Sequence, residues 1–567
     1  MPTTSGKPLL ELATAYNSLR DSGFDFSTAV GEPIDNAIQA QATKIYIITK
    51  TIEKDNPNSK KKLPVIQRVA IIDNGYGMNA DVLHSCLQLG YSTRYNDREG
   101  IGRFGVGATL AAISQCKKIS VFSRDKSTED FLSTYIDIDE IANKYQLEIP
   151  YPVITKPSIK ANPLLNQDSG TIIVWDKCDR LETDPNGKPI NSKLLLDELE
   201  EWISRAYRYF LWDKREIYLN GKSIIAHDPL YLNPKGTKLS EDEPAKVEFS
   251  HELEWQIPNN PTKTSKIKIT LTLLPESLRP KRGAGGEPPA IERRIDENEG
   301  ISLLRHKREV AFGNFYPMLP SVIEIDRWWG CEINFEPDLD ECWEIRNVKR
   351  GARPIAELRE AIKKLLSKKV LDLRKEIQEY WKRVDAANAQ EKGVHTPAED
   401  IVKEVENTVK PAVQAGKVLS PEQKEEKRRE VIEDPELPEH EKTVLRQKVV
   451  GPSPLPISIK SKAMAGAEFM ETDHIGNGQI VLTFNKEHPF FSEIYSKLEE
   501  LEQSVDENTQ TTALVIRYAI DLLLMAYGRA ESMIDLDNPT INEVMTELRS
   551  YWGVQLRKYI KKLADEQ

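Results

Sequence analysis

Asp73-Asn-Gly-Tyr-Gly-Met78 follows directly on Val65–Ile72 (VIQRVAII), a run rich in β-branched residues that predicts a buried strand. An Asp at the end of such a strand provides a buried acceptor, and the two glycines allow a ligand to approach the backbone closely. A carboxylate suits the exocyclic amino group of adenine, because that group is a hydrogen-bond donor on a flat ring edge. The alternative is an ordinary β-turn, since Asn-Gly is a common turn pair.

A second segment, Glu32-Pro-Ile-Asp-Asn-Ala37, lies within a helix predicted from about Ser27 to Gln41. Glu32 and Asn36 are four residues apart, so they project from the same helical face. The carboxylate is suited to taking a proton from an attacking water, and the amide oxygen to binding a hard cation. The alternative is a solvated helix surface. Pro33 removes one backbone donor and is expected to kink the helix, which leaves the aim of Glu32 open.

The third segment, Gly100-Ile-Gly-Arg-Phe-Gly-Val-Gly107, precedes the apolar helix predicted at Ala108–Ile113. Four glycines before a helix allow backbone N–H groups to surround phosphate oxygens near a favourable helix dipole. The segment is not a P-loop, because GxxxxGK[ST] is absent from the sequence. It also does not follow the first strand of a βαβ unit, as a dinucleotide-binding fingerprint should. A flexible loop without a ligand is the alternative.

These segments, in this order and followed by Ser169-Gly-Thr171 at the start of a strand, resemble the Bergerat ATP-binding fold. That superfamily includes DNA gyrase B subunits, the heat-shock chaperone, histidine kinases and MutL mismatch-repair proteins. The resemblance implies ATP and Mg²⁺ as ligands, Glu32 as the general base and Asn36 as the magnesium ligand. It implies that Asp73 binds the adenine amino group, with Thr171 assisting. The other nucleotide-binding positions that it implies are Gly75, Gly77 and Met78 beside the nucleotide, and Gly102, Arg103, Phe104, Gly105, Val106 and Gly107 in a lid over the phosphates.

Sequence features also separate the branches of the superfamily. A histidine kinase would carry a phospho-acceptor His upstream, and the first His is His84. Arg205–Leu232, with its IYLNG and HDPL segments, is similar to the start of the second domain of MORC-type ATPases. The resemblance implies a prokaryotic member of that group. Leu339–Lys349 resembles the segment that brings a lysine to the γ-phosphate, a role implied for Lys349 with Arg350 as the alternative. The alternative is that Lys349 is an ordinary surface lysine.

The predicted fold class is α+β, in four parts. Residues 1–188 form the two-layer α/β sandwich that binds ATP, and residues 189–370 form an α/β transducer domain similar to ribosomal protein S5. Residues 371–456 are rich in Glu, Lys, Pro and Val and predict a charged helical or flexible linker. Residues 457–567 predict a small α+β domain of unknown role.

Composition restricts the classes of protein further. The chain has 567 residues and a formal net charge of -11, which argues against coating nucleic acid by bulk charge. The longest apolar stretch, Ala513–Tyr527, is interrupted by Arg517 and Asp521, so no membrane span and no membrane partner are expected. Five separated cysteines without a CxxC pair predict neither disulfides nor a zinc module. The expected location is the cytoplasm.

The resemblance implies a slow ATPase that acts as an ATP-gated dimeric clamp, with Met1–Tyr16 as an exchange arm. A DNA-linked role, including defence against phage, is implied by MORC-type relatives, and four basic residues are candidates for phosphate contacts or simply for solubility: Lys281, Arg282, Arg293 and Arg294. Two alternatives remain open. One is a chaperone or scaffold that binds a protein partner through its C-terminal domain, and the other is a nucleotide sensor with little turnover.

Overall fold

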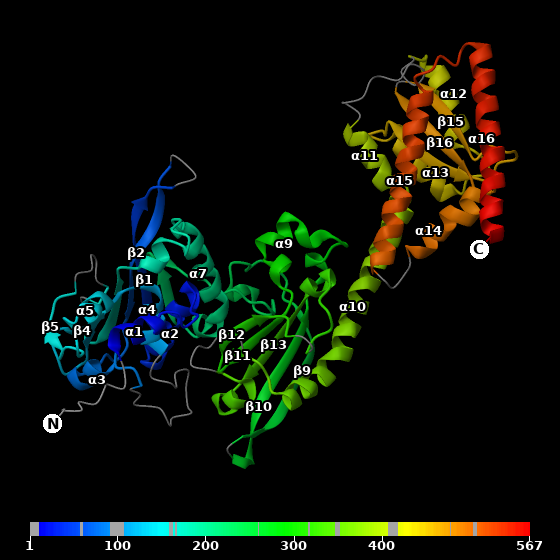
Figure 1. The fold of residues 1–567 in the computed structure, drawn as a ribbon. Coiled ribbons are helices and arrows are strands. Elements are labelled where there is room, and N and C mark those ends of the chain that lie inside the picture. Colours follow the sequence, from blue (N-terminus) through cyan, green and yellow to red (C-terminus); the bar gives the residue numbers. More distant parts are fainter. Residues whose placement is uncertain are drawn as a thin grey trace, which may run out of the picture. The chain divides into compact units, whose positions relative to one another are not determined.

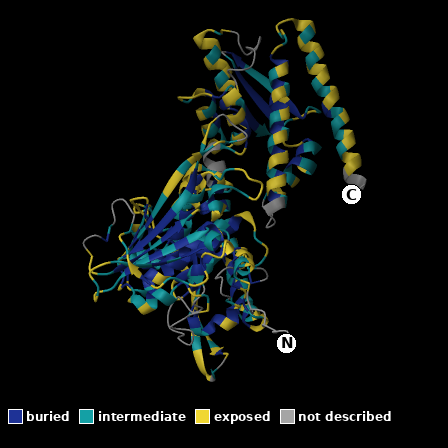
Figure 2. Cartoon of the chain, turned by 60° about the vertical axis from the view of Figure 1, so that its left-hand side comes forward, coloured by how far each residue is buried: buried dark blue, intermediate teal, exposed yellow. Residues whose placement is uncertain are grey.

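The computed structural model describes residues 11–56, 61–90, 107–157, 163–164, 167–258, 260–315, 318–345, 352–405, 418–476, 478–502 and 507–566. The chain divides into two compact units, one ending at Ile377 and the other beginning at Gln378 (Figure 1). Figure 2 shows buried residues concentrated in the strands of the sheets. Each unit is described by itself.

The first unit begins with an eight-stranded sheet of order β5-β4-β3-β6-β2-β1-β7-β8. Its pairings are antiparallel except for β1 with β7. The predicted strands Lys44–Ile52, Val65–Ile72, Ile119–Ser123 and Gly170–Trp175 are confirmed as β1, β2, β3 and β6. The strands are β1 (Lys44–Lys54), β2 (Leu63–Asp73), β3 (Lys118–Arg124), β4 (Leu132–Asp137), β5 (Val153–Ile154), β6 (Gly170–Asp176), β7 (Glu216–Leu219) and β8 (Lys222–Ser223).

Helices cover one face of this sheet, where a large apolar core includes Ile34, Ile47, Ile71, Ile113 and Ile203. A smaller apolar cluster lies on the other face. The predicted mixed α+β class is therefore confirmed. The helices are α1 (Leu12–Leu19), α2 (Phe26–Gln39), α3 (Ala80–Ser85), α4 (Gly107–Gln115), α5 (Ile138–Ala142), α6 (Asp179–Glu182), α7 (Ser192–Ala206) and α8 (Arg208–Trp212).

The hairpin β7–β8 turns on Asn220 and Gly221, both with positive φ, as the Asn-Gly pair predicts. Its place differs from the prediction, which assigned it to the second domain. β7 instead extends the first sheet, pairing in parallel with β1, and Tyr46 stacks on Tyr218 at 4.9 Å between ring centroids. A parallel partner so distant in sequence leaves no local signal.

A second sheet, of order β12-β11-β13-β10-β9, follows in the same unit (Figure 1). Gly300–Val310, predicted as one strand, is a hairpin in which His306 and Lys307 turn with positive φ. The predicted mobile loop 279–300 contains short helices that bury Ala284, Ala290 and Ile295. The elements are β9 (Lys246–Ile257), β10 (Asn260–Leu273), α9 (Pro288–Glu292), β11 (Ile301–Arg305), β12 (Arg308–Gly313), β13 (Trp329–Phe335) and the 3₁₀ segments η1 (Pro234–Gly236), η2 (Glu276–Leu278), η3 (Ala284–Gly286), η4 (Ile295–Glu297), η5 (Glu324–Trp328) and η6 (Pro337–Trp343).

The second unit contains a three-stranded sheet of order β14-β16-β15 with helices around it. Part of the linker predicted over 371–456 belongs to this unit, because Val431, Leu445 and Val449 form an apolar cluster with Ile475 and Val481 of the sheet. Averaged composition hid these spaced apolar residues. The elements are α10 (Ala356–Lys392), which starts in the first unit, then α11 (Thr396–Val405), α12 (Pro421–Ile432), α13 (Glu439–Val450), β14 (Ile457–Lys462), β15 (Met470–Gly476), β16 (Gln479–Asn485), the π-helical η8 (Phe490–Tyr495), α14 (Ser496–Leu501), α15 (Glu507–Glu531) and α16 (Pro539–Glu566).

Within the part of the chain that the structure describes, one stretch of α15, Thr509–Glu531, has the length and composition of a membrane span. No membrane span had been predicted there, because Arg517 and Asp521 interrupt the apolar stretch. Leu524 and Met525 pack in the core of the second unit, and the two interrupting residues, Arg517 and Asp521, are buried and 3.9 Å apart. These features are those of a core helix.

Candidate nucleotide site

Helix α2 presents Glu32 and Asn36 differently. Asp25 caps the helix by accepting the Thr28 N–H at 2.8 Å, and the helix continues through Pro33. Glu32 is buried, whereas Asn36, one turn later, is exposed. A buried carboxylate beside an exposed amide suits a base that is shielded from bulk water and a cation ligand that remains accessible.

The Glu32 carboxylate lies against the first residue of α4. A Cβ placed on Gly107 would lie inside contact distance of Glu32 Oε2, so a glycine is needed for this approach. The N-terminal end of a helix stabilises negative charge, which favours a carboxylate there. Of the predicted lid, only Gly107 belongs to the described residues; Gly102, Arg103, Phe104, Gly105 and Val106 lie outside them.

Asp73 ends β2 directly opposite Thr171 on β6. Its Oδ1 accepts the Gly75 N–H at 2.8 Å, and burial raises the pKa of Asp73 to about 7. Asp73 and Thr171 are each 7% exposed, so the pair forms a nearly dry polar floor. A carboxylate held this way has unused acceptor capacity for a ligand that donates a hydrogen bond.

Ser123 on β3 completes this floor, and no sequence motif had pointed to this residue. Its hydroxyl accepts the Met78 N–H at 2.9 Å and lies 3.0 Å from Thr171 Oγ1 and 3.2 Å from the Gly170 carbonyl oxygen. Ser123 therefore positions both Met78 and Thr171. In the sequence it ends an ordinary strand pattern, so only the pairing of β3 with β6 reveals it.

The two glycines of the Asp73–Met78 segment are required by close backbone packing. A Cβ on Gly75 would lie 2.7 Å from the Ala40 carbonyl oxygen, and one on Gly77, whose φ is +73°, would clash with the Arg124 carbonyl. The Tyr76 N–H donates to Ala40 O at 3.1 Å. Since Ala40 caps α2 one turn after Asn36, these contacts bring the Asp73–Met78 segment against the helix that carries Glu32 and Asn36.

Asn74 is a second residue whose role sequence reasoning did not assign. Its Oδ1 accepts the N–H groups of Thr43 and Lys44 at 2.9 and 2.8 Å, and its Nδ2 donates to Thr43 Oγ1 at 2.9 Å. The side chain thus ties the loop after β2 to the start of β1. Asn74 fixes the backbone from which Asp73 and Gly75 are presented.

The second predicted catalytic residue, Lys349, lies outside the described residues, as does its alternative Arg350. The segment before them is described: η6 buries Leu339, Cys342 and Trp343 in the second domain. The structure therefore brings together Asp73, Gly75, Met78 and Thr171, and separately Glu32 and Gly107, with α2 joining the two groups.

Residues 24–171 match the model of the histidine kinase-, DNA gyrase B- and HSP90-like ATPase family. The N-terminal domain is a GHKL ATPase domain. Among solved structures, a similar chain is described as the "Crystal Structure of N terminal domain of a DNA repair protein", with 16% identity and a TM-score of 0.37 over 66% of this chain and 99% of that one. No curated protein matches the sequence.

The residues of the GHKL domain fit a magnesium-bound nucleotide. Mg²⁺ in nucleotide sites takes one or two protein oxygens and completes its shell with phosphate and water. The exposed Asn36 amide would offer one such oxygen, and the described residues contain no cluster of three His, Cys, Asp or Glu that could hold a metal ion. At Gly107 the absence of a Cβ leaves room for the Glu32 carboxylate at the N-terminal end of α4.

Proposed function

We propose that this protein binds ATP with Mg²⁺ in its GHKL domain and hydrolyses it slowly. The observation that carries the proposal is the buried floor of Asp73, Thr171 and Ser123 beside the helix that presents Glu32 and Asn36. The Asp73 carboxylate accepts the adenine amino group, with Thr171 beside it. Gly75, Gly77 and Met78 form the adjoining wall.

Glu32 is the general base of this proposal. It takes a proton from water as the water oxygen bonds to the γ-phosphorus, and the bond from that phosphorus to the β–γ bridging oxygen breaks to release ADP. Asn36 holds Mg²⁺, which neutralises phosphate charge. Gly107 admits the Glu32 carboxylate to the N-terminal end of α4, and Gly102 to Val106 close over the phosphates.

Hydrolysis is tested directly with the purified full chain. Phosphate release should require Mg²⁺ and stop in EDTA, and a single-turnover assay should convert bound ATP to ADP. Binding without conversion would identify the alternative, a nucleotide sensor.

The nucleotide state also gates dimerisation in this proposal. Lys349 senses the γ-phosphate from the second domain, as a point charge on a long stem is able to do. Met1–Tyr16 then exchanges between two copies. Light scattering on the full chain should show a monomer without nucleotide and a dimer with Mg²⁺ and a non-hydrolysable ATP analogue. A mass independent of nucleotide would remove the clamp and leave the ATPase.

DNA as the clamped partner has weaker support from the basic residues singled out in the sequence. Lys281 pairs with Glu287 at 2.8 Å, Arg294 with Glu201 at 2.6 Å, and Arg293 binds both oxygens of Asp242 at 2.6 and 2.8 Å. Paired cations attract phosphate less, so the protein-partner alternative stays open. Salt-dependent retention of DNA, with and without the ATP analogue, separates the two partners.

A further inference from the structure

Arg308, the first residue of β12 in the second domain, reaches the helix that carries the proposed base. The guanidinium is buried, and its Nε donates to Asp35 Oδ1 at 3.4 Å. It lies 5.1 Å from the ring centroid of Trp202 and 5.6 Å from that of Tyr207. An arginine from the second sheet therefore occupies an aromatic-lined position behind α2.

The turn of α2 around Glu32 is held by these same groups. The Tyr207 hydroxyl lies 2.7 Å from Asp35 Oδ1 and 2.9 Å from the Gly31 carbonyl oxygen. A Cβ on Gly31 would lie 2.5 Å from Trp202 Cη2 and 3.0 Å from Arg308 Nη2, so glycine is needed for the approach. Contacts at Gly31 and Asp35 bracket Glu32 along the helix.

Glu32 is one of the groups whose charge acts on Arg308. Burial lowers the pKa of Arg308, but Asp35, Tyr207 and Glu32 outweigh it and raise the pKa overall. Asp35 is fully buried, so removal of its cationic partner would leave an uncompensated charge inside the fold.

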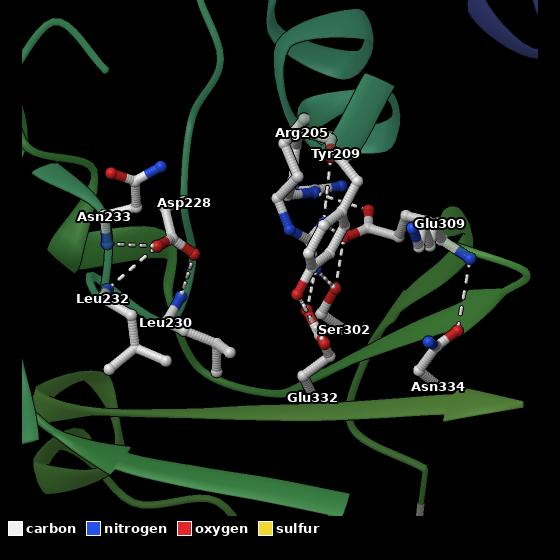
Figure 3. A network of polar contacts seen from close by, with 12 residues as sticks. Arg205, Tyr209, Asp228, Leu230, Leu232, Asn233, Ser302, Glu309, Glu332 and Asn334 are labelled. Carbon is white, nitrogen blue, oxygen red and sulfur yellow. Dashed lines mark hydrogen bonds and ion pairs between the residues drawn. The ribbon is translucent and has the colours of Figure 1, made fainter. Parts of the chain in front are cut away.

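The residue after Arg308 anchors the strand on the opposite side, as strand alternation requires. Figure 3 shows Glu309 at the centre of a buried network. Its carboxylate accepts from Arg205 Nε at 2.6 Å and from Ser302 Oγ at 2.6 Å, while Arg208 joins Glu309 at 3.3 Å to Glu332 at 2.5 Å. The origin of the Arg308 side chain is therefore fixed relative to α7 and α8.

We propose that Arg308 is a positioning residue for ATP hydrolysis: from the second sheet it holds the Gly31–Asp35 turn of α2 so that Glu32 faces the attacking water. The proposal rests on the proposed function of Glu32. It gives the second domain a direct effect on the catalytic step, separate from nucleotide binding at Asp73.

The test compares full-length variants Arg308→Gln and Arg308→Lys with the control Arg374→Gln. Arg374 also belongs to the first unit and pairs with a buried carboxylate: it binds both oxygens of Asp326 in η5 at 2.6 and 2.8 Å. A displacement of about 1 Å at a reacting group costs about 100-fold in rate. We expect Arg308→Gln to lower kcat by about 10- to 100-fold with ATP affinity changed less than about threefold, and Arg308→Lys to recover part of the loss.

The control separates positioning from stability. Arg374→Gln should lower Tm about as much as Arg308→Gln but leave kcat within about twofold of wild type, since it breaks an ion pair to a buried carboxylate away from α2. Asp35→Asn combined with Arg308→Gln should lower kcat less than the product of the single effects.

Three results would overturn the proposal: normal kcat in Arg308→Gln, an equal loss of kcat in Arg374→Gln, or a loss confined to ATP affinity. Failure of the proposed function has a different signature. In that case wild type releases no phosphate, or Glu32→Gln releases it at the wild-type rate, and the positioning role falls with it.

Discussion

Two buried carboxylates, Asp73 in the first unit and Asp521 in the second, illustrate opposite uses of the same group. Asp73 receives one described hydrogen bond, from the Gly75 N–H at 2.8 Å. Asp521 is surrounded: His395 Nδ1 lies 2.9 Å from Oδ2, the Tyr495 hydroxyl donates to Oδ1 at 2.7 Å, and Arg517 lies 3.9 Å away.

The difference identifies which carboxylate has capacity for a ligand. A buried carboxylate needs several donors to offset lost hydration. Asp521 obtains them from the protein, whereas Asp73 responds through a raised pKa that a hydrogen-bond-donating ligand can reverse. Four predictions test this contrast.

Glu32→Gln, in the first unit, should lower kcat by about 10²- to 10⁴-fold, because general base catalysis contributes that much, and should leave ATP binding nearly unchanged. Glu399→Gln is the matched change in the second unit, where the buried Glu399 accepts the Ile459 N–H at 2.8 Å and pairs with Lys448 at 2.5 Å. Steady-state phosphate release should be insensitive to that control. Equal losses in the two variants would contradict a catalytic role for Glu32.

Asp73→Ala should weaken ATP binding by about 10- to 100-fold, since a hydrogen bond to a charged group is worth about 1.5–3 kcal/mol. Asp521→Asn should leave ATP affinity unchanged but destabilise the second unit by about 3 kcal/mol. Titration calorimetry measures the first effect and denaturant unfolding the second. Undiminished affinity in Asp73→Ala would exclude the adenine contact.

The raised pKa of Asp73 predicts a pH dependence with a definite sign. The folded pKa of about 7 exceeds the ordinary Asp pKa of 3.8, so this residue's contribution to stability is present below about pH 4 and is lost as the pH rises through 7. Binding of ATP to the ionised carboxylate should release a proton, and affinity should increase up to about pH 7. Calorimetry in two buffers of different ionisation enthalpy reports that proton, which Asp73→Ala should not release.

Ser123→Ala should produce the smallest effect, about a two- to tenfold loss of ATP affinity, because it removes a neutral hydrogen bond from the Met78 N–H. The matched control is Thr134→Val, which removes a hydroxyl that donates to Pro150 O at 2.7 Å in the same sheet. If both variants bind ATP equally well, Ser123 has only a structural role.

Local patterns predicted much of the first unit. Alternating β-branched residues located β1 and β2, Asn220-Gly221 located a hairpin, and Asp73 was predicted correctly as a buried residue at the end of a strand. The order of the motifs predicted the family. Each of these signals is carried by neighbouring residues, which is why sequence alone was sufficient.

Features that depend on distant pairing escaped prediction. Arg308 meets Asp35 from 273 positions away, and Ser123 acquires its role only when β3 pairs with β6. The helices within 396–450 were read as linker because their charged surface outweighs apolar residues such as Val431 and Leu445, which the C-terminal sheet buries.

The parallel pairing of β1 with β7 has a practical consequence for dissecting the protein. A fragment that ends at residue 188 would contain the whole family match but leave β1 with an unpaired edge, where Tyr46 loses its stacking partner Tyr218. Unpaired edges recruit other chains. Truncation after β8, at about residue 226, therefore keeps the pairing partner of β1, whereas a cut at the apparent motif boundary favours aggregation.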